Sequence, residues 1–84
     1  MSDAKKAIFA QLHSIVVGET ASEPDRIRSE NYIKKDLGLD DLALTSIIAE
    51  IEARYNVTLE RDEWPEDVTL DFLVEEIKAQ LDAL

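Results

Sequence analysis

The sequence has 84 residues, with no cysteine, a single histidine, two glycines and two prolines. Without cysteine it has no disulfide framework, thiolate metal site or cysteine nucleophile, and this composition suits a reducing cytoplasm. No second histidine is available to complete a metal site with His13, so we expect a surface residue there. A glycine-rich phosphate loop is also missing. These absences argue against an enzyme.

Basic residues and long apolar runs are scarce as well. Nine lysines and arginines oppose 19 acidic residues, which gives a formal net charge of -10. Such a charge repels nucleic acid and anionic lipid; it either favours encounters with basic protein surfaces or keeps the chain in solution. The N-terminal residues 1–6 lead into an amphipathic pattern, so we expect neither a signal peptide nor a membrane-spanning helix. We therefore predict a cytoplasmic monomer whose partners are proteins.

A chain of this length forms one domain, here residues 1–84. Apolar spacing predicts a first helix over residues 3–17, capped by Ser2 or Asp3 and stopped by Gly18. Residues 19–35 have no sustained period and predict a long loop. We expect apolar side chains to pin this loop by packing inward. These side chains are Ile27, Tyr32, Ile33 and Leu37.

Three further helical segments follow. Asp40 is a suitable N-cap for a second helix that reaches Tyr55, and Thr69 for a last helix whose apolar face extends to Leu81. Between them, residues 60–64 predict one helical turn that Pro65 ends. The sequence thus predicts an all-α fold, a small four-helix bundle with a long first loop and a short third helix.

Residues 36–42 carry the most informative motif, Asp-Leu-Gly-Leu-Asp-Asp-Leu. It resembles the attachment segment of acyl carrier proteins, roughly Asp-Leu-Gly-x-Asp-Ser-Leu. Residues 42–55 and 68–77 resemble the second and last helices of that family, so the likeness spans about residues 27–81. The resemblance implies the family's four-helix fold and a carrier of acyl intermediates in fatty acid, polyketide or related biosynthesis. It also implies a 4'-phosphopantetheine arm, a phosphopantetheinyl transferase, and partner enzymes with basic surfaces.

Asp41 departs from the motif, because it stands where the family has the serine that carries the arm. Attachment transfers a phosphoryl group onto an alcohol at a helix N-terminus, and a carboxylate has no hydroxyl to accept it. We expect that this chain cannot take the arm at position 41. Three explanations are open: a deliberate substitution that blocks modification or supplies negative charge, a natural loss that leaves an arm-free interaction or regulatory subunit, or attachment at another serine. The nearest is Ser46, about 7 Å along the helix and 140° around it.

The resemblance also implies a partner surface along the second helix, and we expect partners to contact the start of that helix together with the short third helix. The residues assigned to it are Asp36, Asp40, Leu42, Ala49, Glu52 and Glu63. Ala43, Ser46 and Ala53 stand where the family often has acids, and much of the acidity lies instead in residues 60–76. A solvated acidic surface is the alternative interpretation. We expect Trp64 to pack at the end of the bundle rather than to anchor a partner.

Overall fold

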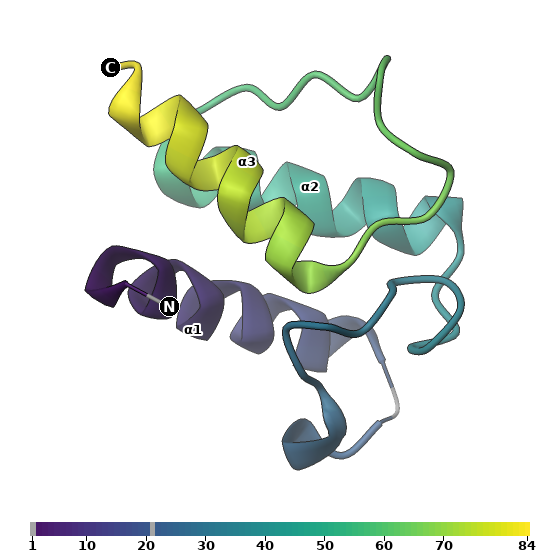
Figure 1. Ribbon diagram of the computed structural model, residues 1–84. Coiled ribbons are helices and arrows are strands. Elements are labelled where there is room, and N and C mark those ends of the chain that lie inside the picture. Colours follow the sequence, from purple (N-terminus) through teal and green to yellow (C-terminus); the bar gives the residue numbers. More distant parts are fainter. Residues whose placement is uncertain (1, 21) are drawn as a thin grey trace.

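The computed structural model describes residues 2–20 and 22–84, in which it has three α-helices, one short 3-10 helix and no strand (Figure 1). The helices are α1 (Asp3–Glu19), η1 (Pro24–Arg26), α2 (Asp41–Tyr55) and α3 (Leu70–Asp82). Helix α1 packs against both α2 and α3, and the long loop crosses the end of the molecule where α2 and α3 begin (Figure 1). Among the described residues, no helix has the length and apolar character required to cross a bilayer.

Side-chain caps define where the helices begin. Asp40 accepts a hydrogen bond from the Ala43 N–H (2.8 Å), and Thr69 accepts one from the Phe72 N–H (3.0 Å). Ser2 accepts the Lys5 N–H (3.3 Å) and caps α1. These bonds satisfy backbone donors that have no partner within the helix. The predicted caps at residues 2, 40 and 69 are confirmed.

The ends of α1 and α2 differ. Helix α1 continues through Gly18 to Glu19, and the chain leaves it in an extended conformation at Thr20, so the predicted stop at Gly18 is wrong. A helical glycine costs about 0.5–1 kcal/mol relative to alanine, which is too little to end the helix by itself. Helix α2 ends at Asn56, whose φ of 55° places it in the left-handed region that asparagine tolerates.

One apolar core joins the three helices and the long loop. Its most deeply buried side chains are Leu12, Val16, Ile33, Ile47, Ile51, Leu70, Leu73, Val74 and Ile77. Full burial of each such side chain contributes about 1.5–3 kcal/mol relative to leaving it in water. The helical members recur at the predicted three- and four-residue steps, which confirms the predicted apolar faces.

The long loop is held by buried side chains and by pairing with the segment before α3. Ile27, Ile33 and Leu37 are buried as predicted. Tyr32 was predicted to pack inward, but it is 39% exposed and the Lys35 ammonium lies 5.6 Å from its ring centroid. The backbone of Tyr32 forms an isolated antiparallel bridge with Thr69. The Ile33 N–H donates to the Val68 carbonyl (2.9 Å).

The short helix predicted over residues 60–64 does not form. The segment 57–69 has no helix; it contains bends and one turn, in which the Trp64 N–H donates to the Arg61 carbonyl (3.0 Å). The Leu59 side chain is buried and its N–H donates to the Glu52 carboxylate (2.8 Å), and these contacts hold the chain against α2 just before residues 60–64. The described residues therefore form an all-α fold with three α-helices rather than the predicted four. Trp64 packs partly buried, edge-on against Phe72, as expected.

Candidate functional site

The turn that leads into α2 is built by backbone hydrogen bonds around Gly38. The Gly38 N–H donates to the Lys34 carbonyl (3.0 Å), and the Leu39 N–H donates to the Ile33 carbonyl (3.1 Å). Gly38 has a φ of 68°, a left-handed conformation that favours glycine. The side chains of Leu37 and Leu39 on either side are buried. This arrangement fixes the position of Asp40, and through it the first residue of α2.

Two carboxylates hold this turn from outside the helix. Asp36 accepts a hydrogen bond from the Tyr32 N–H (2.8 Å). The two oxygens of Asp67 accept the N–H groups of Lys34 (2.9 Å) and Lys35 (3.0 Å). Asp67 thereby joins the segment before α3 to the segment before α2. Sequence reasoning missed this clamp, because 33 residues separate Asp67 from Lys34 and no local pattern links them.

Asp41 is the first residue of α2 and its side chain is 76% exposed. One carboxylate oxygen lies 2.7 Å from the Lys34 ammonium. The hydrogen bond from Lys34 holds the pKa of Asp41 below its ordinary value, and the positive charges of Lys34 and Arg61 add to this lowering. The same pair raises the pKa of Lys34. Asp41 is therefore an anion at neutral pH, with a cationic partner already in place.

The nearest hydroxyl groups along α2 belong to Thr45 and Ser46, and both are hydrogen-bonded. Thr45 donates to the Asp41 carbonyl (2.9 Å) and accepts from the Arg61 guanidinium (3.0 Å). Ser46 donates to the Glu19 carboxylate at the end of α1 (3.1 Å). Both hydroxyls lie past the first turn of α2, about 6–8 Å along its axis from Asp41.

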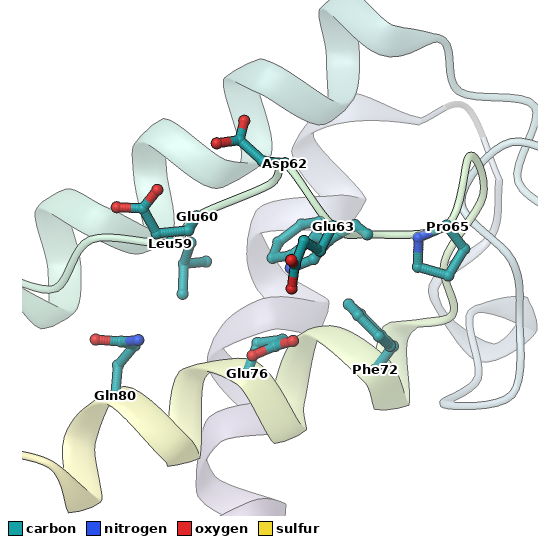
Figure 2. A pocket seen from close by; sticks show the side chains of 9 residues that line it. Leu59, Glu60, Asp62, Glu63, Pro65, Phe72, Glu76 and Gln80 are labelled. Carbon is teal, nitrogen blue, oxygen red and sulfur yellow. The ribbon is translucent and has the colours of Figure 1, made fainter.

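The remaining residues of the predicted partner surface differ in their exposure and in the element on which they lie. Leu42 is 79% exposed beside Asp41, and Ala49 is exposed two turns further along the same face of α2. Glu52 is half-buried and its carboxylate holds the Leu59 N–H, so this side chain serves the fold. Glu63 is exposed, but it lies on the segment that faces α3 (Figure 2). The structure thus gathers Asp36, Asp40, Asp41 and Leu42 at the start of α2, and Glu63 belongs to another surface.

His13 and the acidic residues around Asp41 do not form a metal centre. The Nε2 atom of His13 lies 2.8 Å from the Pro24 carbonyl, and its ring packs edge-on against Phe9. In the parts of the chain that the structure describes, no three histidine or acidic side chains converge on a common point. His13 therefore helps to hold the 3-10 turn of the long loop.

Comparison with known proteins places this arrangement in a family. Residues 10–77 match the protein family described as "Phosphopantetheine attachment site". The chain belongs to the acyl carrier protein family. The acyl carrier protein of Beutenbergia cavernae is 30% identical over 70 residues, which cover 83% of this chain and 85% of that protein.

Two further acyl carrier proteins are similar to the chain. That of Wolinella succinogenes is 25% identical over 72 residues, covering 86% of this chain and 95% of the relative. That of Campylobacter fetus subsp. fetus is 28% identical over 53 residues, covering 63% and 69%. The family assignment made from residues 36–42 and the helical pattern is confirmed. The matched range 10–77 includes the whole turn around Gly38 and the start of α2.

Proposed function

We propose that the chain is a carrier-type scaffold that docks to acyl-processing enzymes of fatty acid, polyketide or related biosynthesis, and that Asp41 prevents attachment of the 4'-phosphopantetheine arm at position 41. The observation that carries this proposal is the position of Asp41. A turn that matches the family's motif presents it, exposed, as the first residue of a capped helix. This is where a modifying enzyme would reach a side chain.

The side chains at the start of α2 do not fit a covalently attached arm. The arm is joined through a phosphodiester to an alcohol, and the Asp41 carboxylate offers no hydroxyl to receive the phosphoryl group. Lys34 and Arg61 are cations that would suit a phosphate, but the Lys34 ammonium is paired with Asp41 itself. The scaffold therefore retains cationic side chains beside the site while its nucleophile is missing.

We also propose that neither neighbouring hydroxyl replaces the missing serine. The Ser46 hydroxyl donates a hydrogen bond to Glu19 at the end of α1. The Thr45 hydroxyl donates to the Asp41 carbonyl and accepts a hydrogen bond from Arg61. Modification of either would break these bonds and would place the phosphate beside the body of the helix. The helix N-terminus, with its free N–H groups, is the favoured place for an anion.

Partner enzymes would contact the start of α2 and its exposed face. Asp40 and Leu42 lie there together, and Ala49 continues the same face. Asp36 and Glu52 accept hydrogen bonds from backbone N–H groups, so we assign them a structural role rather than direct contact with a partner. The partners that we propose are basic surfaces of acyl-processing enzymes, attracted by the acidic residues of 60–76 and docked on the exposed face of α2. Catalysis belongs to those enzymes in this proposal, and the chain itself carries none.

The proposal is tested by intact mass after incubation with a phosphopantetheinyl transferase and coenzyme A. We expect Asp41→Ser to gain one phosphopantetheine group and the unaltered chain to gain none. Asp40→Ser is the matched control, because it keeps an N-cap and supplies a hydroxyl one residue too early. A gain by the unaltered chain contradicts the proposal, and repeating the reaction with Ser46→Ala then shows whether Ser46 is the acceptor.

A second function is an arm-free interaction or regulatory subunit that docks to the same enzymes. The Lys34–Asp41 pair favours it, because the place of the modifiable side chain is taken by a satisfied ion pair. The same experiment separates the two functions. If Asp41→Ser folds but gains no mass, the surface no longer supports the transferase and the arm-free subunit is the better account.

A further inference from the structure

A second surface lies between segment 59–65 and α3. A groove of about 500 Å³ has its walls in these two elements, and Figure 2 shows the side chains that line it. We call it the acidic groove. Its lining residues are Leu59, Glu60, Asp62, Glu63, Trp64, Pro65, Phe72, Glu76 and Gln80. None of them belongs to residues 36–42. Phe72, Glu76 and Gln80 recur every four residues, so the α3 wall extends for roughly 12 Å.

The floor of the acidic groove is aromatic. Trp64 and Phe72 meet edge to face, with ring centroids 5.3 Å apart and planes at 82°. Both side chains are only partly buried, so some of their surface remains open to the groove. Aromatic faces attract the cationic groups of lysine and arginine, and tryptophan does so most strongly.

The rim of the acidic groove carries four carboxylates, and among the described residues none of them forms an ion pair or a hydrogen bond. These side chains are Glu60, Asp62, Glu63 and Glu76. The nearby basic groups are engaged elsewhere. Arg61 reaches across to Thr45 on α2, and Lys78 pairs with Asp82 (2.7 Å). The negative charge of the rim is therefore not neutralised within the described structure.

The segment that forms one wall is fixed at both ends. At one end Leu59 is buried, and its N–H is held by Glu52. At the other end Val68 is buried and Asp67 binds the backbone of residues 34 and 35. A wall ordered before binding loses little conformational freedom when a ligand arrives.

We propose that the acidic groove binds a basic, partly apolar peptide segment of a partner protein, with a lysine or arginine side chain over Trp64 and between the rim carboxylates. A length of roughly 12 Å accommodates about four residues of extended chain at 3.3 Å each. Charge complementarity selects this occupant, because four unpaired carboxylates surround an aromatic floor. The inference is independent of the proposed function, since the groove requires neither an arm nor Asp41.

The experiment uses a capped hexapeptide of alternating arginine and leucine. Trp64 is the only tryptophan, so its fluorescence reports directly on the groove. We expect a saturable change in emission, with backbone NMR shifts concentrated in residues 59–65 and 72–80. A peptide of alternating glutamate and leucine should produce neither. Shifts confined to residues 36–49 would overturn the proposal.

Charge variants separate a specific site from general attraction. Glu60→Lys with Glu76→Lys should weaken peptide binding about tenfold or more. The control, Glu23→Lys with Glu30→Lys, changes net charge equally at exposed positions in the long loop and should weaken it less than about threefold. Equal weakening by both pairs overturns the proposal. The double variant Glu60→Gln with Glu76→Gln removes the two charges but keeps the shape of the side chains. It should still bind the basic peptide more weakly than the control variant Glu23→Gln with Glu30→Gln.

Other occupants give distinct results in the same assay. A Trp64 response to octanoyl-pantetheine without a response to the basic peptide would indicate an acyl groove and contradict the proposal. A response that follows protein concentration alone would indicate a second copy of the chain, with the same consequence.

Discussion

The start of α2 and the acidic groove use their carboxylates in opposite ways. On α2 and the turn before it, Asp40 caps the helix, Asp41 pairs with Lys34, and Glu50 pairs with Arg54 (3.4 Å). Around the groove the rim carboxylates have no partner within the described residues. A carboxylate with a partner in the same chain stabilises the local fold. An unpaired carboxylate attracts cationic groups of other molecules. The unpaired carboxylates of the groove therefore lie away from the site that the family motif marks.

The exposed face of α2 supports this contrast. Its exposed side chains include several neutral ones, namely Leu42, Thr45, Ser46, Ala49 and Ala53. Residues 60–76 contain eight acidic residues and one arginine. A basic partner would thus be steered toward residues 60–76 by their negative charge. The exposed face of α2 offers that partner mostly uncharged side chains.

The largest effect that we predict comes from breaking the link between the two regions. Asp67→Ala removes the acceptor for the N–H groups of Lys34 and Lys35 and should destabilise the fold by about 2 kcal/mol. For a chain of this size that lowers Tm by about 8–16 °C. Thermal unfolding followed by circular dichroism measures it. Glu66→Ala, an exposed neighbour, is the control, and equal Tm values for the two variants would contradict the role of Asp67.

An intermediate effect should follow from Gly38→Ala. A Cβ there meets no atom within 4 Å, so the cost is conformational: the φ of 68° disfavours alanine by about 1 kcal/mol. Gly18→Ala makes the same change within a helix, also in open space, and should stabilise by about 0.5–1 kcal/mol. Urea unfolding measures both free energies. Shifts of the same sign would show that the turn before α2 does not require a left-handed residue.

The smallest effect concerns the Lys34–Asp41 pair. Because the folded pKa of Asp41 is lowered, its stabilising effect is present above about pH 4 and is lost as pH falls through that pKa. Because the pKa of Lys34 is raised, the pair persists until pH rises past about 10.4 and then weakens. Because an ion pair at the surface contributes little to stability, Asp41→Asn should lower Tm at pH 7 by less than Gly38→Ala does.

This difference in Tm should shrink toward pH 2, near pH 11 and in high salt. Glu23→Gln, at an exposed acid outside the ion pairs of the described chain, is the control. A Tm difference for Asp41→Asn that stays constant with pH would mean that the pair contributes nothing to stability.

The sequence predicted the local features of the fold and missed most of the distant ones. The three long helices and the caps at Asp40 and Thr69 follow from spacing and capping chemistry, which act over a few residues. The short helix predicted over residues 60–64 was wrong: a single non-helical turn forms there, and the preceding Leu59 is held to Glu52 on α2 by a contact that the local pattern does not reveal. Tyr32 was misplaced because an aromatic residue in a loop gives no indication of which side of it is buried.

The same contrast between local and distant features holds for the candidate site at the start of α2. Asp41, Asp40 and Leu42 were assigned to the candidate site because one continuous motif contains them. The pairing of Asp41 with Lys34 and the contact of Arg61 with Thr45 depend on where the loops fold. The acidic groove requires α3 to lie against segment 59–65, and the sequence did not predict it, although the clustered acids and Trp64 were recognised separately.

In the function that we propose, the start of α2 keeps the shape of an attachment site without its acceptor. The intact mass of the unaltered chain, measured beside Asp41→Ser after both meet the transferase and coenzyme A, tests this most directly. The account predicts that the unaltered chain keeps its mass and the serine variant becomes heavier by one phosphopantetheine group. An added phosphopantetheine on the unaltered chain would contradict it.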